Sequence, residues 1–312
     1  FTREEVLGRT PVEIGLWVVP AGRDEGLRRL RTGEPVRGVE SEFRMKDGSL
    51  RTCLMSAELI EIDGEACVLT ALTDITERKR AENDARFFAE LAERIRVIED
   101  ADELLWAVSC AVGEYLRVGR CFFTEIDLAG GRGVVRRDYC RGMPSVAGEY
   151  PVSDYSPAAQ AESMAGRTIV NCDATIDPRT AELYDQTYGP AGERAYVAVP
   201  LRREGIWRAT LWASVDQPRQ WLPSEVNLLE TVAERTWLAV ERLRLYEEAQ
   251  RARAAAEAAV RVRDQFFSLA AHELNNPLAA LIGHAQLLER RFKRAEGASE
   301  RDGERIVGDG HA

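Results

Sequence analysis

The residues best suited to chemistry lie near the end of the chain, in residues 266–292. Apolar residues there keep a roughly helical spacing, and His272 falls on the polar side of that pattern, directly before Glu273. Histidine can act as an acid, a base or a nucleophile near neutral pH. Pro277 follows five positions later, and proline removes a helical hydrogen bond. The stretch therefore predicts a helix that presents an imidazole beside a carboxylate, just before a bend.

Seven residues beginning at His272, HELNNPL, resemble the H-box of sensor histidine kinases, which usually reads H-E-[L/I]-[R/K]-[N/T]-P-L. The resemblance implies that His272 is the phosphoacceptor and Glu273 its acid/base partner. It also implies that Asn276 helps to position the attacking group and that Pro277 allows the bend by which a nucleotide-binding domain reaches the histidine. Asn275 replaces the family's basic residue, which would weaken contacts to phosphate or to a response regulator. The alternative interpretation is an exposed histidine on a kinked helix.

Composition excludes several classes of protein. A length of 312 residues predicts two or three domains, and a net charge of -10 argues against a nucleic-acid-binding surface. No window approaches the ~18 to 20 continuous apolar residues of a membrane span. The six cysteines are scattered without a C-x-x-C pair and there are only three histidines, so we expect no metal site. Isolated thiols favour a reducing compartment, and we expect a cytoplasmic protein.

Residues 1–79 show the alternation of half-buried strands, with hairpin signals at Asp47-Gly48 and Asp63-Gly64. The segments GRTPVEIGLW, FRMKDGSLR and ALTDITERKRAE resemble the C-terminal part of a PAS domain. That family begins with two further strands that are not found here, so we expect the N-terminus to be a fragment boundary. No ligand is predicted for this part.

Residues 80–98 predict a helical connector. Its apolar residues Phe87, Leu91 and Ile95 would either pair with a second copy or pack on the next domain.

Residues 99–246 predict a second α/β region, in which a helix leads into antiparallel strands and Pro223 begins a long exit helix. The predicted strands include residues 134–140 and, after a turn at Arg203-Glu204-Gly205, residues 206–215. The segments YPVSDYSP, TIVNCDATIDPRT, RAYVAVPLRREGIWRATLW and WLPSEVNLLETVAERTWLAVE resemble a complete GAF domain. Such domains bind cyclic nucleotides, tetrapyrroles or haem, or take protein signals. No histidine occurs in the region to accompany a bilin or to ligate haem, so no cofactor is expected here. The residues that could line a pocket for an unknown small ligand are Asp154, Tyr155, Asp173, Asp177 and Tyr196, although such residues more often cap turns.

Residues 247–265 predict a coiled-coil signalling helix. Leu245, Ala252, Ala259 and Phe266 repeat every seven residues, and this register indicates an alanine-rich, moderately stable homodimer. A weak coil could shift when the preceding domain changes shape and so alter access to His272. Residues 266–312 predict an incomplete dimerisation and phosphoacceptor region, with a polar, glycine-rich tail after residue 294 in which residues 301–307 could begin a second helix.

The predicted fold is thus α+β and multidomain: a partial PAS domain, a complete GAF domain and a long helix leading into the phosphoacceptor helix. Phosphorylation of a histidine needs ATP and Mg²⁺ held beside it, and no signature of the family's ATP-binding domain follows His272. We therefore expect part of a cytosolic sensor histidine kinase, a homodimer that passes phosphate to a response-regulator aspartate and is inactive without that domain. The alternatives are a non-catalytic sensory and dimerisation module, phosphorylated in trans or not at all, and a GAF-based receptor for a cyclic nucleotide.

Overall fold

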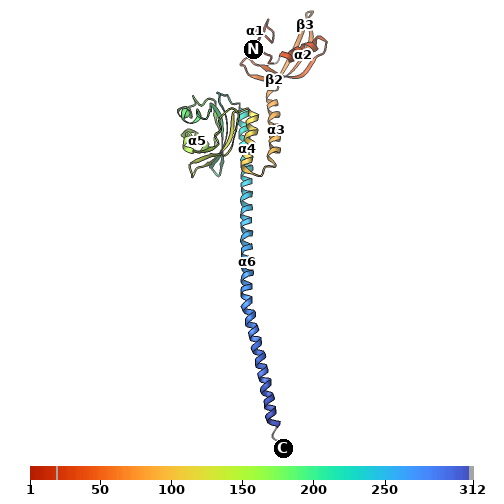
Figure 1. The fold of residues 1–312 in the computed structure, drawn as a ribbon. Helices are drawn as coiled ribbons and strands as arrows, with labels where there is room; N and C mark the ends of the chain where they lie inside the picture. The colour runs from red at the N-terminus through yellow and green to blue at the C-terminus, as the bar shows by residue number, and fades with distance from the viewer. Residues whose placement is uncertain (19, 309–312) are drawn as a thin grey trace. The chain divides into compact units, whose positions relative to one another are not determined.

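A computed structural model describes residues 1–18 and 20–308. The chain divides into two compact units, Phe1–Val240 and Glu241–Ala312, and Figure 1 labels their elements. The first unit holds two separate antiparallel sheets, and the second consists of the later part of one long helix. The observed class is α+β, as predicted.

The first sheet is a meander in the order β1-β2-β3. Asp63 and Gly64 both have positive φ, 51° and 82°, as a tight two-residue hairpin turn requires. The three predicted strands are therefore present, joined by the predicted turns. The elements of this part are α1 (Arg3–Val6), α2 (Pro20–Arg31), β1 (Val36–Arg44), β2 (Leu50–Ile62) and β3 (Glu65–Asp74).

The end of β3 is tied to the following helix α3 (Thr76–Ile95) by side-chain hydrogen bonds. The Thr76 hydroxyl donates to Asp74 Oδ1 at 2.6 Å and accepts a hydrogen bond from the backbone amide of Thr52 in β2 at 3.0 Å. Arg51 forms an ion pair with the same aspartate at 2.9 Å. These contacts hold the start of α3 against strands β2 and β3.

The connector helix α3 packs on the next region through two adjacent phenylalanines. Phe87 stacks on Tyr115 of α4 (Ala101–Leu116) with ring centroids 4.3 Å apart, and the Tyr115 hydroxyl donates to Asp84 at 2.6 Å. Phe88 receives the guanidinium of Arg235 over its ring at 5.1 Å. Of the two alternatives for residues 80–98, the structure shows packing on the following domain.

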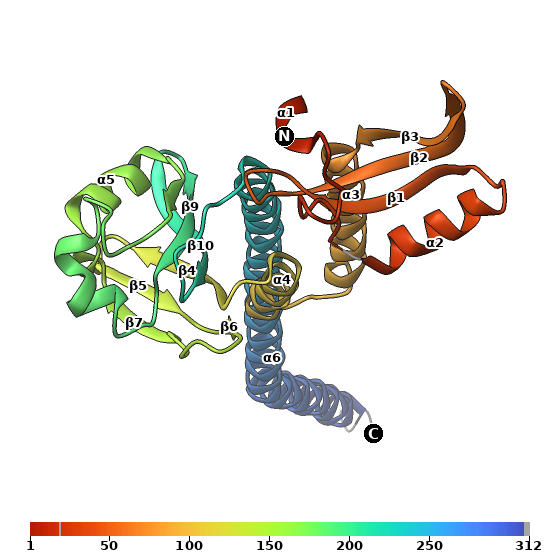
Figure 2. The same ribbon diagram turned by 90° about the horizontal axis from the view of Figure 1, so that it is seen from above.

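The second sheet has the order β7-β5-β4-β10-β9-β8, with β6 also paired to β4. Figure 2 shows α4 and the start of the long helix α6 (Pro223–Gly308) on one side of this sheet and α5 on the other. The remaining elements are β4 (Arg120–Asp127), β5 (Arg132–Val135), β6 (Asp138–Cys140), β7 (Gly148–Pro151), η1 (Val152–Asp154), α5 (Pro157–Ala165), β8 (Ile169–Asn171), η2 (Ala181–Leu183), η3 (Tyr184–Tyr188), β9 (Ala195–Arg203) and β10 (Ile206–Val215).

Alternate residues of the central strands point to opposite faces, as the twofold period of a strand demands. Phe122 and Trp212 are cross-strand partners and belong to the apolar cluster on the α5 side. The neighbouring residue Phe123 faces α4 instead, beside Leu105 and Trp106. The sheet is therefore buried on both faces, and only the α5 side holds the aromatic residues described below.

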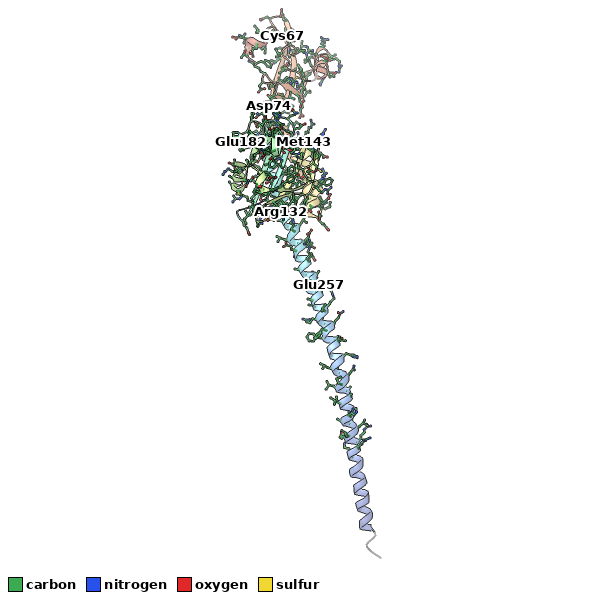
Figure 3. All side chains as sticks on the ribbon, turned by 60° about the vertical axis from the view of Figure 1, so that its left-hand side comes forward. Cys67, Asp74, Arg132, Met143, Glu182 and Glu257 are labelled. Atoms are coloured by element: carbon green, nitrogen blue, oxygen red, sulfur yellow. The ribbon has the colours of Figure 1, made fainter. Side chains whose placement is uncertain are left out.

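The helix α6 runs from Pro223 to Gly308 and continues through Pro277. The predicted polar tail after residue 294 is wrong for residues 295–308, which are helical. Alanine, glutamate and arginine are good helix formers, and enough of them occur there to offset the single glycines. In Figure 3 the side chains drawn around Glu257 project from the helix, and the described side chains of residues 248–269 are all exposed.

Candidate functional site

His272 lies on α6 with its imidazole ring exposed. Asn276 is one helical turn further on the same face and is also exposed. Pro277 has no amide hydrogen, so the carbonyl of residue 273 loses its usual helical partner. The side chain of Glu273 lies outside the described residues. The helix thus presents an accessible imidazole, with an amide side chain and an unpaired backbone oxygen within one turn.

A second histidine on the same helix provides an internal comparison. The Nδ1 atom of His284 lies 2.8 Å from the carbonyl oxygen of Ala280, so the ring is held against its own helix. No such bond is found for His272 within the described side chains. Among the described residues, the ring of His284 therefore has a backbone partner and the ring of His272 has none.

A second candidate site is a cavity of about 110 Å³ on the α5 side of the larger sheet, which we call the aromatic cavity. Five of its side chains are aromatic, and they come from strands β4, β7 and β10 and from the segments that cover them. The lining residues are Arg120, Phe122, Val135, Val146, Tyr150, Asp154, Tyr155, Thr187, Tyr188, Ala191, Glu193 and Trp212.

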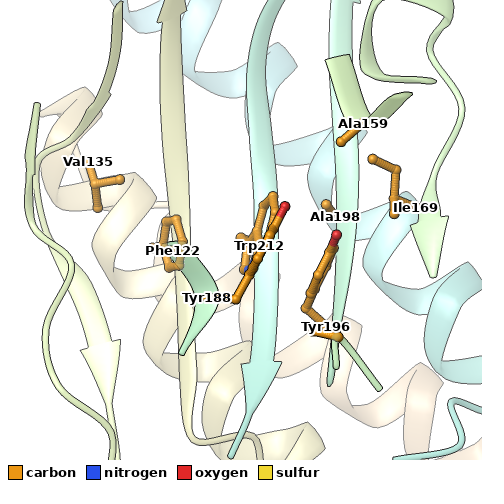
Figure 4. Packing of buried hydrophobic residues seen from close by; sticks show 9 residues of the cluster. Phe122, Val135, Ala159, Ile169, Tyr188, Tyr196, Ala198 and Trp212 are labelled. Atoms are coloured by element: carbon orange, nitrogen blue, oxygen red, sulfur yellow. The ribbon is translucent and has the colours of Figure 1, made fainter. Parts of the chain in front are cut away.

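The aromatic rings of this region are stacked. Figure 4 shows Phe122, Trp212 and Tyr196 in a row on neighbouring strands, with Tyr188 in front of the row. Trp212 lies 4.4 Å from Tyr196 and 6.2 Å from Phe122 between ring centroids, and both pairs are nearly parallel. The hydroxyl groups of Tyr188 and Tyr196 are buried without a hydrogen bond in the described part of the chain. Burial raises the pKa of Tyr188 to about 12, so its hydroxyl stays neutral.

A buried ion pair lies at one side of the cavity. Arg120 and Glu193 are 2.7 Å apart, and their side chains are only 1% and 4% exposed. The same Glu193 oxygen accepts a hydrogen bond from the indole of Trp212 at 3.0 Å, and the other Arg120 nitrogen donates to the carbonyls of Pro144 and Ala191. Burial raises the pKa of Glu193, while the guanidinium of Arg120 acts in the opposite direction. Hydrogen bonds thus satisfy both terminal nitrogens of Arg120 and one Glu193 oxygen, whereas Arg120 Nε is buried without a partner among the described residues.

Two families match this chain. Residues 100–240 match the GAF domain, and residues 262–307 match the His Kinase A (phospho-acceptor) domain. The chain carries a GAF domain followed by a His Kinase A domain. The resemblance to sensor histidine kinases is thereby confirmed, together with a GAF fold that leads into a long helix. No comparison tests the PAS assignment of residues 1–79, which stays a prediction, as do the predicted domain boundaries.

The chain is also similar to two proteins named circadian input-output histidine kinase CikA. The one from Thermosynechococcus vestitus is 24% identical over 259 residues, which are 72% of this chain and 34% of that protein. The one from Synechocystis is 31% identical over 118 residues, 32% of this chain and 16% of that protein. The chain therefore spans about a third or less of the length of these relatives.

Among solved structures, the PixJ GAF domain of Thermosynechococcus elongatus in its blue-light-absorbing form is similar. The identity is 21%, the match covers 48% of this chain and 90% of that one, and the TM-score is 0.42. The chromophore-binding domain of the bacteriophytochrome RpBphP3 from R. palustris has 16% identity, covering 78% of this chain and 84% of that one, with a TM-score of 0.47.

The structure places three of the five predicted pocket residues of the GAF domain at or beside the aromatic cavity. Asp154 and Tyr155 line it, Asp154 being exposed and Tyr155 half-buried. Tyr196 does not line the cavity but stacks on Trp212, which does. These three residues come from separate parts of the sequence and are brought together by the fold.

Asp173 and Asp177 lie outside the lining of the cavity and stabilise the segment after β8. Asp173 accepts hydrogen bonds from Arg194 at 3.0 Å and from the Thr175 hydroxyl at 2.7 Å, and these contacts lower its pKa to about 2. Asp177 is paired with Arg179 at 2.5 Å. Both carboxylates organise turns, the alternative role that polar residues at such positions often have.

Sequence reasoning missed the charged residues of the cavity, Arg120 and Glu193. A signal was present, because Arg120 opens the strand RCFFTEID on the same face as Phe122. A charge at a position expected to be buried requires a partner. The partner is 73 residues away and could not be named from the sequence.

Among the described residues, no three histidine, cysteine or acidic side chains gather in a way that could hold a metal ion. The helices of residues 1–18 and 20–308 include none that is long and apolar enough to span a bilayer.

Proposed function

We propose that this chain is the sensory and phosphoacceptor part of a sensor histidine kinase, in which His272 takes up a phosphoryl group and passes it to an aspartate of a response regulator. One observation carries the proposal. The segment that matches the phospho-acceptor family contains His272, whose ring is exposed and makes no described hydrogen bond. His284 lies in the same matched segment but is bound to its own helix.

The chemistry assigned to His272 is a simple displacement. An unprotonated ring nitrogen attacks the γ-phosphorus of ATP, the bond from that phosphorus to the ADP oxygen breaks, and the imidazole loses its remaining ring proton. Catalysis of such transfers consists mainly of positioning and of charge neutralisation by Mg²⁺ and cations. We assign the binding of ATP and Mg²⁺ to a separate catalytic domain. Glu273 would hold the ring proton, and Asn276 would hydrogen-bond to the entering group.

We further propose that α6 forms a homodimer along its later part. Phe266, Leu269, Leu274 and Leu281 are each more than 60% exposed, and a lone helix gains nothing from exposed apolar side chains. Pairing with a second copy would bury this face. A response-regulator receiver domain would then approach the polar face that carries His272.

The contacts of α3 suggest how a signal would reach the histidine. Phe87 packs on α4 through Tyr115, and Phe88 packs on α6 through Arg235. Because α6 is one continuous helix, a displacement at Arg235 can pass along it to His272. Locking the predicted coil with disulfides between the copies, through Ala252→Cys or Ala259→Cys, should then abolish any response to a signal while leaving the acceptor histidine intact.

Phosphotransfer to the folded chain tests the assignment of His272. A separate histidine-kinase ATP-binding domain and Mg²⁺-ATP are supplied, and acid-labile label is measured on wild type, His272→Gln and His284→Gln. We expect label on wild type and on His284→Gln and none on His272→Gln. Label that persists in His272→Gln, or that disappears in His284→Gln, would overturn the assignment.

The second candidate function is a non-catalytic sensory and dimerisation module. The aromatic cavity supports this function, because a ligand could bind there without any phosphotransfer to His272. A folded dimer that takes no label from several supplied catalytic domains would support it. A cyclic-nucleotide receptor is less favoured, because ligand pockets usually measure about 300–1,000 Å³ and the aromatic cavity measures about 110 Å³.

A further inference from the structure

The aromatic cavity limits the size of any ligand that it could hold. Its volume is about 110 Å³, and an engineered apolar cavity of about 150 Å³ is known to hold one benzene molecule. A tetrapyrrole or a nucleotide therefore does not fit the cavity in this conformation. A compact group with a handful of non-hydrogen atoms does.

The walls of the cavity favour a ligand that interacts with aromatic rings. Tyr150, Tyr155, Tyr188 and Trp212 line it together with Phe122. The faces of such rings carry negative potential and attract cations, most strongly in places shielded from water. The guanidinium carbon of Arg120 already lies 5.9 Å from the Phe122 ring centroid, so this region accommodates one cation over an aromatic ring.

The charges at the cavity favour a cation over an anion. The terminal nitrogens of Arg120 are occupied by Glu193 and by two backbone carbonyls, and its Nε is buried without a partner among the described residues, so the charge of Arg120 is compensated mainly by Glu193. Asp154 lies at the exposed end of the lining, and its carboxylate has no ion pair within the described residues. One positive and two negative side chains therefore line the cavity, and the uncompensated charge is the carboxylate of Asp154.

The geometry points to a binding site for a small organic cation of the methylated-ammonium class, with its alkyl groups against the aromatic rings and its charge facing Asp154. The inference deepens the proposed sensory function by naming the class of ligand that the GAF domain would sense. Aromatic side chains and a single carboxylate are well suited to a cation that cannot donate hydrogen bonds. A strongly hydrated metal ion or ammonium would be a poor occupant, since the apolar walls cannot replace its water.

Calorimetric titration of the full chain tests this inference without any phosphorylation. The probes are tetramethylammonium and choline, with 3,3-dimethylbutan-1-ol as the uncharged analogue of choline and acetate as a small anion. We expect the two cations to bind and the uncharged analogue to bind more weakly, by between about twofold and thirtyfold, the range that a cation–π contact supplies. Equal or tighter binding of the uncharged analogue or of acetate would overturn the inference, and so would the absence of cation binding to folded protein.

Substitutions at the exposed end separate the contributions of charge and ring. Asp154→Asn should weaken cation binding severalfold and leave binding of the uncharged analogue unchanged. Asp216→Asn, at an exposed aspartate outside the lining, is the matched control and should change neither. Tyr155→Phe keeps the ring and should retain binding, whereas Tyr155→Leu should lose it. If Asp154→Asn binds the cation as wild type does, the charge assignment fails.

The two proposals fail in different experiments. If the label persists in His272→Gln while the wild-type chain still binds the cation, only the kinase assignment is overturned. Absence of cation binding with labelled His272 would overturn only the ligand class.

Discussion

The two ends of helix α6 use the same kind of residue in opposite ways. Leu229, in the part that belongs to the GAF domain, is completely buried, whereas Leu278, in the phospho-acceptor domain, is 52% exposed. Both lie on one continuous helix and both belong to an amphipathic pattern. The difference is that the sheet and α4 provide a partner surface for the first leucine, and the described chain provides none for the second.

This contrast indicates which part of the molecule is stable by itself. The GAF domain buries its apolar residues within one chain, at about 25 cal/mol for each Å² removed from water. An isolated helix gains only its backbone hydrogen bonds, which are marginal in water. The apolar face of the phospho-acceptor helix is therefore free for association with another helix, and a weak, adjustable contact is what a signalling element needs.

The largest effect should come from breaking the buried ion pair of the GAF domain. Glu193→Gln leaves the guanidinium of Arg120 without its counter-charge at a site that is 1% exposed. The expected loss of unfolding free energy is about 3–5 kcal/mol, measured by urea unfolding with tryptophan fluorescence. Five of the six tryptophans lie within residues 100–240, so the signal reports mainly on the GAF domain.

A double variant is the control for this experiment. Arg120→Met combined with Glu193→Leu removes both charges and should cost less than Glu193→Gln alone, because no charge is then left unpaired. If Glu193→Gln is as stable as wild type, the ion pair does not stabilise the core. The claim that buried contacts of this kind make the GAF domain more stable than the exposed helix would then be weakened.

The next effect compares the two leucines directly. Leu229→Ala should destabilise the GAF domain by about 2–5 kcal/mol, because it leaves a cavity in a packed core. Leu278→Ala should change the unfolding free energy of the monomer by less than about 0.5 kcal/mol, but it should weaken self-association in sedimentation equilibrium. Equal losses of monomer stability in both variants would contradict the claim that Leu229 is packed within the monomer and Leu278 is not.

The sequence predicted those parts of the fold that depend on local patterns. Strand β10 was predicted with the bounds that it has, because alternating apolar residues follow the Arg203-Glu204-Gly205 turn, in which Glu204 and Gly205 have φ of 53° and 80°. A single strand was expected over residues 134–140, and the structure divides it at Arg136 and Arg137, where both side chains turn to acidic partners.

The parts that depend on long-range contacts could not be predicted. The pairing of Arg120 with Glu193 spans 73 residues, and no local pattern indicates it. Of the candidate pocket residues, the sequence could not separate Asp154, which faces the cavity, from Asp173, which is held by Arg194. His272 could be named because the H-box is a contiguous motif, whereas the aromatic cavity exists only after folding.

A smaller effect on stability is expected where α3 meets the GAF domain. This interface is less buried than the core around Leu229 and more buried than the helix around Leu278. Tyr115→Phe removes the 2.6 Å hydrogen bond to Asp84 but keeps the ring stacked on Phe87. The expected loss is about 0.5–1.5 kcal/mol, together with faster amide hydrogen exchange in α3. Tyr139→Phe, which removes a hydroxyl without a described hydrogen bond, is the control. Unchanged exchange in α3 would show that the hydrogen bond does not hold the helix in place.

The smallest effect should be the pH-dependent contribution of Asp173 to the GAF domain. Hydrogen bonds from Arg194 and Thr175 lower its pKa to about 2, below the value of about 3.9 in an unfolded chain. A lowered carboxyl pKa contributes stability that is complete above the unfolded value and is lost as the pH falls toward the folded value. The Tm difference between wild type and Asp173→Asn should thus be constant from about pH 7 to pH 5 and shrink between about pH 4 and pH 2.

Salt provides a second test of the same contact. Because the Arg194 side chain is 33% exposed and that of Asp173 is 17% exposed, added salt should also reduce the Tm difference. Asp216→Asn, at an exposed aspartate without a described partner, is the control and should change the Tm only slightly. A difference for Asp173→Asn that stays constant down to about pH 2 would show that the aspartate acts through its shape in the turn rather than through its charge. The GAF domain would then owe none of its stability to the Asp173–Arg194 ion pair.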